Sequence, residues 1–391
     1  MVRPFQLARI PRIIFREGII TQLPDQALVF GRNLVLVTGK SSFMSSVRAE
    51  RLLADFHRKG FAVHHVAIQG EPSPFDIDSA VDALKSEAID LVVGIGGGSV
   101  LDAGKALSAM INRTESVKRF LEGVGDMDHP GTKLPYIALP TTSGTGSEAT
   151  KNAVISETGV NGFKKSLRHD NFVPDLAMVD PELTLDCPPY ITAASGMDCF
   201  TQLTEAYLSD KSYEYTDALA MEGLKAIKHS LVRCCSDGND IEARAGMSFA
   251  ALTSGICLAN AGLGIVHGFA SSVGGFYDIP HGLLCGTLMA KSNEITVREL
   301  RKKTDGQAAL KKYALLGRLF LEETGKDDNY YIDGFIVYLR KLTNDLGLPG
   351  LENFGIGEKE VGLICAATEN KNNPVKLNID DLQEILSERC Y

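Results

Sequence analysis

A chain of 391 residues with 44% hydrophobic and 23% charged side chains has an ordinary globular composition and is long enough for two domains. Fibrous and extensively disordered classes are thereby excluded. The formal net charge of -9 argues against a protein that gains its affinity from nucleic-acid phosphates.

No apolar run reaches the roughly eighteen residues that a membrane span requires, and the opening residues lack the apolar segment of a signal peptide. We therefore expect a cytoplasmic protein that contacts neither membrane nor nucleic acid. The 8 cysteines include no C-x-x-C pair, so we expect reduced, mostly buried thiols rather than disulfides or structural zinc.

The first half of the chain alternates short β-rich runs with helical stretches. Apolar runs at 33–38, 61–68, 90–95 and 135–139 predict strands, and three- to four-residue apolar spacing at 43–59 and 77–89 predicts helices between them. Strands separated by helices pair in parallel. This pattern predicts a doubly wound α/β domain over residues 1–185.

The second half has a different texture. After the Pro-Pro pair at 188–189, the chain is rich in Ala, Leu and Gly and shows long helical periodicities, with candidate helices at 216–235, 308–323 and 331–346. We expect an all-helical domain over residues 186–391. The space between the two domains is then the expected ligand site.

A glycine-rich loop follows the third expected strand. Gly96, Gly97 and Gly98 lead into Ser99, and the spacing from Ser99 to Asp102 is that of a capping box at a helix start. Glycines and free helix N–H groups favour a bound phosphate, although Ser99 stands where a standard dinucleotide motif has its last glycine. A tight turn without ligand is the alternative.

A second loop of hydroxyls and glycines, Pro140-Thr-Thr-Ser-Gly-Thr-Gly-Ser147, follows the next expected strand. Carboxyl ends of parallel strands meet at one edge of a sheet. The two loops together therefore favour a nucleotide-binding edge over a bare turn.

Candidate metal ligands lie in the helical half. Asp198 and Gln202 are four residues apart and share a helix face, and His267 and His281 follow. Two histidines and a carboxylate suit Fe(II) or Zn(II) and leave positions open for substrate. Spacing alone equally allows hydrogen-bonded structural histidines.

Taken in order, these segments resemble the iron-containing (group III) alcohol dehydrogenase family. The resemblance is carried by residues 96–102, 140–148, 196–198, 266–270 and 280–282, with Asp180-Pro181 and the segment 372–374. It implies a dehydroquinate-synthase-like fold, with a dinucleotide-binding domain, an all-helical domain and a divalent metal between them.

Two departures from the family pattern concern the site. Gln202 stands where the family has its first metal-binding histidine, and an amide oxygen is a weaker ligand, so we expect reduced Fe or Zn affinity, another metal, or three protein ligands. Ser271 stands where many members have a further histidine near the cofactor. Solvent, the cofactor ribose or the Ser271 hydroxyl is left to carry the proton.

The end of the first expected strand bears on the coenzyme. NAD-preferring members resemble one another in an aspartate there, whereas this chain has Gly39, Lys40 and Ser41. Without the acid, a 2′-phosphate fits beside Lys40 and the serines, so we expect NADP to be accepted and preferred over NAD. Lys164 matches a family lysine near the cofactor; a solvated basic residue is the alternative.

The resemblance implies a metal-dependent oxidoreductase that interconverts a small alcohol and its aldehyde or ketone with NAD or NADP, running as a reductase. Asp198, His267 and His281 are the expected catalytic metal ligands, with Gln202 as a doubtful fourth. We expect a homo-oligomer, a dimer by family habit. The expected coenzyme contacts are Gly39, Lys40, Ser41, Gly96, Gly97, Gly98, Ser99, Asp102, Thr141, Thr142, Thr145 and Lys164.

Two other functions remain open at this stage. A lyase of the dehydroquinate-synthase-like fold would use the nicotinamide transiently, but such an enzyme takes phosphorylated substrates and should have basic residues beside the ligands. None of the nearby basic residues adjoins them in sequence: Lys211, Lys225, Lys228, Arg233 and Arg244. A dinucleotide-binding protein with a decayed metal site is the second alternative, suggested by Gln202 and Ser271.

Overall fold

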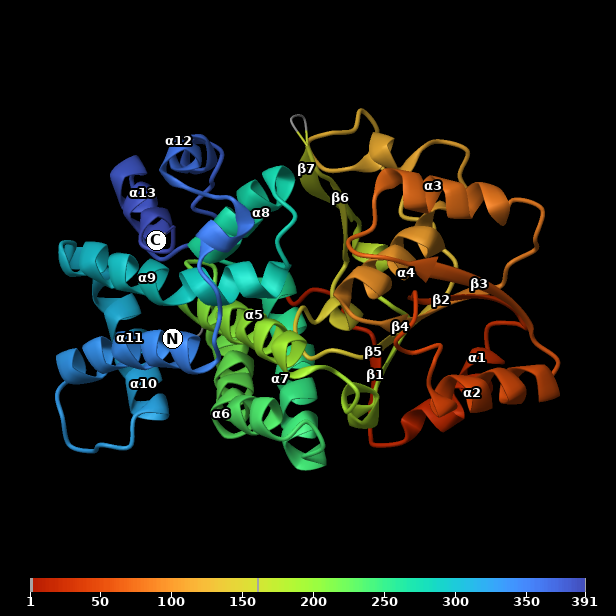
Figure 1. Cartoon of the computed structure of the whole chain (residues 1–391), viewed down its shortest axis with the longest axis horizontal. Helices are drawn as coiled ribbons and strands as arrows, with labels where there is room; N and C mark the ends of the chain where they lie inside the picture. Colours follow the sequence, from red (N-terminus) through yellow and green to blue (C-terminus); the bar gives the residue numbers. More distant parts are fainter. Residues whose placement is uncertain (1–2, 160–161, 391) are drawn as a thin grey trace.

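A computed structural model describes residues 3–159 and 162–390. An α/β half and a helical half lie side by side along the long axis of the molecule (Figure 1). This is the architecture that the sequence predicts.

The α/β half is built on a parallel sheet with the strand order β1-β8-β5-β4-β2-β3. Successive residues of β2 face opposite sides: Val35 and Val37 pack under α3 and α4, whereas Leu34 and Leu36 pack under α1 and α2. Helices on both faces confirm the doubly wound prediction. The strands are β1 (Arg12–Phe15), β2 (Asn33–Gly39), β3 (Ala62–Ile68), β4 (Leu91–Gly96), β5 (Tyr136–Pro140) and β8 (Leu176–Val179); the helices are α1 (Leu23–Ala27), α2 (Val47–Arg58), α3 (Pro74–Ala83) and α4 (Gly98–Met110).

The four predicted strands are present, each shifted by at most one residue at an end. The sequence analysis missed the four-residue edge strand β1, the equally short β8, and the antiparallel hairpin of β6 (Asn152–Glu157) and β7 (Phe163–Arg168). Strands of this length carry too few residues for a recognisable alternation. The first predicted helix begins later than expected, at Val47, because the Ser46 side chain accepts the Ala49 amide and caps it.

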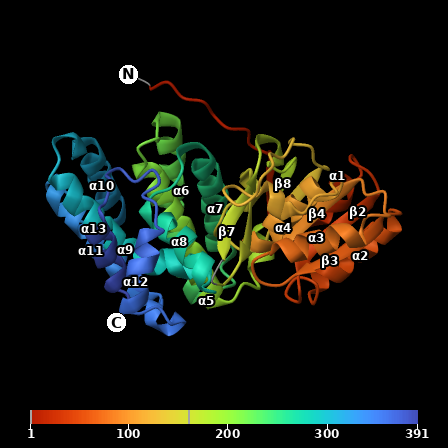
Figure 2. The same ribbon diagram turned by 90° about the horizontal axis from the view of Figure 1, so that it is seen from above.

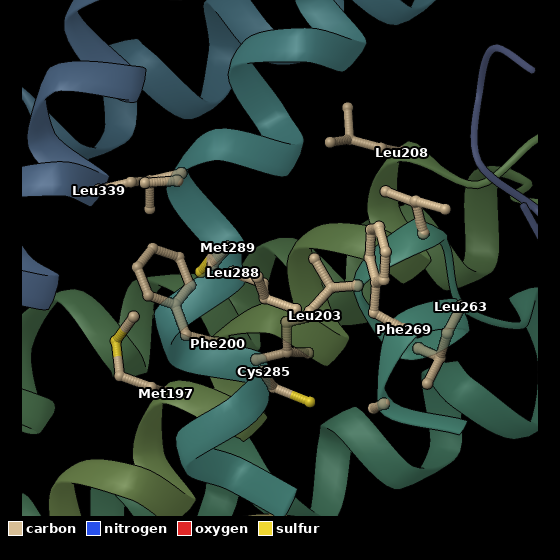
Figure 3. Close-up of a cluster of buried hydrophobic side chains, with 14 of the residues drawn as sticks. Met197, Phe200, Leu203, Leu208, Leu263, Phe269, Cys285, Leu288, Met289 and Leu339 are labelled. Atoms are coloured by element: carbon tan, nitrogen blue, oxygen red, sulfur yellow. The ribbon is translucent and has the colours of Figure 1, made fainter. Parts of the chain in front are cut away.

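The helical half consists of long helices around one apolar core, part of which Figure 3 shows. The predicted helices 216–235, 308–323 and 331–346 correspond to α6, α10 and α11. Gly347, with φ of 64°, follows the end of α11. The bounds are α5 (Pro189–Leu208), α6 (Glu214–Ser236), α7 (Ile241–Ala261), α8 (Ile265–Phe276), α9 (His281–Arg301), α10 (Gln307–Phe320), α11 (Asp328–Asp345), α12 (Glu358–Ala366) and α13 (Ile379–Ser387).

The N-terminal segment links the two halves. Before entering the sheet at β1, the chain runs along the helical half (Figure 2). Phe5 stacks on Tyr213 with ring centroids 4.4 Å apart, and the Ala8 amide donates to Asn260 Oδ1 at 2.7 Å. The predicted boundary between residues 185 and 186 falls between β8 and α5 and stays a prediction.

In the described part of the chain, no helix taken singly has the length and apolar character needed to cross a membrane. Only α7 and α8 taken together pass such a test, and a bend of 95° separates them. All 8 cysteines are free thiols, as expected.

Candidate metal and coenzyme site

The glycine loop lies at the carboxyl edge of the sheet, where the fold places ligands. Gly96 ends β4 and is paired in register with Pro140 of β5, and Thr38 of β2 is paired with Ile95. The expected capping box is wrong: α4 begins at Gly98, one residue before Ser99, and has no side-chain cap. Val100 and Leu101 donate to the Gly97 carbonyl, so the amides of Gly98 and Ser99 are the ones available to a phosphate.

The structure brings the two loops into direct contact. A Cβ atom on Gly98 would lie 2.7 Å from Thr145 Oγ1, and one on Gly97 would lie 3.3 Å from Thr142 Oγ1. Glycine is required here because any side chain would push the loops apart. Gly97, Gly98, Ser99, Thr141, Thr142 and Thr145 are all partly accessible, which a coenzyme contact demands.

Asp102 is placed differently from the expectation. Its buried carboxylate accepts Ser147 Oγ at 2.5 Å and the Val154 amide at 3.0 Å, and lies 3.6 Å from the Lys105 ammonium. Burial raises the pKa of Asp102 despite this cation. Its oxygens are thus committed to holding the second loop, and coenzyme contact by this side chain is not supported.

The predicted adenosine residues lie at the end of β2. Gly39 is partly exposed and Lys40 and Ser41 are exposed, and Lys40 Nζ donates to Gln69 Oε1 at 3.1 Å. Lys164, on β7, forms an ion pair with Glu71, and its side chain occupies the space that a Cβ atom on Gly274 of α8 would need. The Lys40 ammonium is thus free to meet an anion at the surface, whereas Lys164 is already paired.

Three predicted metal ligands converge from three helices. His267 Nε2 lies 3.3 Å and His281 Nε2 lies 3.6 Å from Asp198 Oδ1. The Cys285 thiol, one turn after His281 on α9, joins them: one ligand atom from each of these residues lies within 4.8 Å of the others. Asp198 and His267 are buried, and His281 is partly accessible.

The donor set fits a divalent cation. Asp198 Oδ1 is buried and has no hydrogen-bond partner among the described residues, although two imidazole nitrogens lie nearby. A buried, unpartnered carboxylate oxygen beside two imidazole nitrogens is the arrangement expected of ligands around a cation. His267 Nδ1 lies 2.7 Å from Glu205 Oε2, a pairing that fixes the ring so that Nε2 offers its lone pair to the centre.

The surroundings favour the deprotonated forms of Asp198 and His281, which are the forms that bind a metal. Burial alone would raise the pKa of Asp198, but His281 and His267 lower it. Burial lowers the pKa of His281 to about 4, so this ring is neutral at pH 7. Burial opposes protonation of His267 as well, but Cys285 and Glu205 raise its pKa well above the ordinary value. A bound cation must displace that proton.

Gln202 does not present its oxygen to the cluster. Its Oε1 accepts from Ser254 Oγ at 2.9 Å, and its Nε2 faces Asp198 Oδ2 at 3.5 Å. If the Gln202 amide were turned over, its oxygen would face the Asp198 carboxylate, and two acceptors would repel each other. This orientation argues against the expected fourth ligand.

Ser271 is partnered by a residue distant in sequence. Its hydroxyl donates to the His267 carbonyl at 2.9 Å and accepts from Lys371 Nζ at 2.9 Å. Lys371 has φ of 48°, the one positive value among non-glycine residues in the described ranges. A backbone held in this region at a candidate site is a functional signal.

Sequence reasoning missed Cys285, Glu205 and Lys371. The first carried a signal, since it stands four residues after His281 and thus on the same helix face. The other two act across the fold, 62 and 100 residues from the partners they contact, and carried none.

Comparison with known proteins shows matches along nearly the whole chain. Residues 11–181 match the family model of the iron-containing alcohol dehydrogenase, and residues 192–390 match the C-terminal model of the Fe-containing alcohol dehydrogenase family. The chain is 28% identical over 384 residues to the NAD-dependent methanol dehydrogenase of Bacillus methanolicus, covering 96% of this chain and 97% of that protein.

A second relative and a solved structure are also similar to this chain over nearly its whole length. The NADPH-dependent butanol dehydrogenase of Clostridium saccharobutylicum is 28% identical over 391 residues, with 96% of each chain covered. The crystal structure of sulfoacetaldehyde reductase from Bifidobacterium kashiwanohense in complex with NAD+ superposes with a TM-score of 0.85 at 27% identity, covering 99% of each chain.

Proposed function

The chain belongs to the iron-containing alcohol dehydrogenase family, and on this basis we propose that it interconverts a small alcohol and its aldehyde or ketone with NAD(P) and a divalent metal. One observation carries the proposal: Asp198, His267 and His281 converge. The Ser254 hydroxyl connects this cluster to the loop that follows β5, because it lies 2.9 Å from Gln202 Oε1 and 3.4 Å from the Gly144 carbonyl. The Ser143 and Ser248 hydroxyls, 3.3 Å apart, tie that loop to α7. Metal and coenzyme sites are therefore held at one junction between the halves.

When bound, the metal polarises the carbonyl oxygen as a Lewis acid and the nicotinamide exchanges the hydride. The chain's own residues hold these groups in place. Asp198 supplies the negative charge, while His267 and His281 supply nitrogen donors from separate helices. Glu205 holds the His267 ring in one orientation.

The coenzyme lies along the carboxyl edge of the sheet in this proposal. The free amide groups at the start of α4 take the pyrophosphate, and Thr141, Thr142 and Thr145 line its path. Gly39, Lys40 and Ser41 surround the adenosine ribose. The exposed Lys40 ammonium and the lack of an acid here favour NADPH over NADH.

The proton that completes carbonyl reduction comes through Ser271 in this proposal. Its hydroxyl already bridges the His267 carbonyl and the Lys371 ammonium. A hydroxyl can both donate and accept a hydrogen bond, so Ser271 can give its proton to the product oxygen and take a new proton from the Lys371 ammonium. We further propose a homo-oligomer, a dimer by family habit, and a cytoplasmic location.

The test removes the nitrogen donors one at a time. His267→Ala and His281→Ala should each abolish aldehyde-dependent NADPH oxidation while leaving the Kd for NADPH unchanged, because the dinucleotide contacts lie on the other half. Activity retained in both variants would refute the metal role. Conversion of a phosphorylated substrate without net change in coenzyme absorbance would instead identify a lyase.

A further inference from the structure

We propose that the Cys285 thiolate is the fourth protein ligand of the metal, in the place that Gln202 vacates, and that the site therefore selects zinc over iron. This inference rests on the proposed function, since it names a ligand of that same metal. It stands on the arrangement of Cys285, Gln202 and Asp198.

The Cys285 sulfur faces the two histidine nitrogens that are offered to the metal. It lies 3.7 Å from His267 Nε2 and 3.8 Å from His281 Nε2. Zinc bond lengths and tetrahedral angles place pairs of N or O ligands about 3.3 Å apart, and N and S ligands about 3.6 Å apart. The observed separations, with 3.3 and 3.6 Å from Asp198 Oδ1 to the nitrogens, match that geometry.

The Cys285 side chain belongs to the buried core, but its sulfur faces the two histidines. Cys285 has no exposed surface, and Figure 3 shows its sulfur pointing away from Phe200 and Met289. The unpartnered Asp198 Oδ1 is an independent sign that a group is bound at the same point.

In this proposal the fourth metal ligand comes from α9 instead of α5. On α5, the Gln202 oxygen accepts from Ser254 of α7, and the Gln202 amide nitrogen remains beside the second oxygen of Asp198. In that position Gln202 orients the carboxylate instead of binding the metal. On α9, Cys285 lies one turn from His281, so one helix supplies two ligands from a single face.

Binding through sulfur changes which metal the site prefers. The thiol gives up its proton to solvent as the sulfur–metal bond forms, so metal uptake releases a proton and becomes tighter as the pH rises. Thiolate is a soft donor that suits zinc, and zinc lies above Fe(II) in the general affinity order. The site should therefore take zinc from an equal mixture of zinc and ferrous ions.

The test uses Co(II) as a spectroscopic probe in the full-length apoprotein. The wild type loaded with Co(II) should show a sulfur-to-cobalt charge-transfer band. X-ray absorption spectroscopy of the zinc-loaded protein should show one sulfur at about 2.3 Å from the zinc. Cys285→Ala should lose the band and bind zinc more than about 100-fold more weakly. Loss of a residue that only hydrogen-bonds to a metal ligand already lowers metal affinity about 10–100-fold, and loss of a ligand should cost more. Cys365→Ala, a buried cysteine on α12, is the matched control and should keep both.

A second variant guards against misfolding. Adding Gln202→His to Cys285→Ala should restore tight zinc binding without the sulfur band. Co(II) bound equally by wild type and Cys285→Ala, with only N and O donors, would overturn the inference while aldehyde reduction left the proposed function standing. A wild type that binds no divalent ion would overturn both.

Discussion

His267 Nδ1 lies 2.7 Å from Oε2 of Glu205, and the same glutamate accepts the Val266 amide through Oε1 at 2.7 Å. The carboxylate thus fixes both the ring and the first turn of α8. Glu205→Gln keeps the shape but removes the charge, so we expect metal affinity to fall by about 10–100-fold. Zinc competition with a chelator measures this, and the exposed Glu222→Gln serves as the control. Equal affinities in the two variants would contradict the role.

The Ser271–Lys371 pair can be tested through the rate of reduction. Ser271→Ala and Lys371→Met should each lower kcat by about 100-fold, the usual worth of a positioned proton donor, with little change in coenzyme Kd. Ser271→His should recover the rate and make it follow the titration of an imidazole. A pH–rate profile of the four proteins decides the matter, and an unchanged kcat in Lys371→Met would remove this residue from the relay.

We expect coenzyme preference to depend on the residues at the end of β2. Lys40→Ala should lower kcat/KM for NADPH by about tenfold or more while sparing NADH, because it removes a charged contact to the 2′-phosphate. Gly39→Asp should go further and favour NADH. Lys85→Ala, an exposed lysine elsewhere in the α/β half, is the control. Parallel losses with both coenzymes would contradict the assignment.

Lys105 is expected to be a structural cation. It has no exposed surface, and its ammonium donates to the Ser147 carbonyl at 2.9 Å and to Thr150 Oγ1 at 3.1 Å beside Asp102. Lys105→Met leaves that carboxylate unpaired, which should cost about 3–5 kcal/mol of unfolding free energy. Lys118→Met, which breaks the exposed pair with Glu157, should cost under about 1 kcal/mol. Urea denaturation measures both.

Glu148 should make stability depend on pH. Burial raises its pKa to about 7 from 4.5. The folded protein therefore holds a proton that the unfolded chain has released, so this group lowers stability as the pH rises from 4.5 to 7. Glu148→Gln should be more stable than wild type by up to about 3 kcal/mol above pH 8, with the difference vanishing toward pH 4.5. A constant difference across this range would contradict the assignment.

Much of the fold followed from local sequence. The long apolar runs that became β2, β4 and β5 fill the middle of a sheet covered on both faces, so all of their residues except the two ends of β2, Asn33 and Gly39, are buried. The short β1 and β8 pair with each other at one edge, and nothing in four residues distinguishes a strand from a loop. The start of α4 was also not predicted correctly. The spacing from Ser99 to Asp102 suited a helix cap, but the helix begins one residue earlier, at Gly98.

The sequence by itself determined the fold class, the glycine-rich loops and three candidate metal ligands, because glycine chemistry, apolar periodicity and ordered motifs are local properties of the chain. Tertiary structure alone decided that Ser254 holds the Gln202 oxygen, that Cys285 turns its sulfur to the histidines, and that Lys371 reaches Ser271. These contacts depend on how separate helices and loops meet, and the side chain that faces an ion is chosen by neighbours far away in sequence.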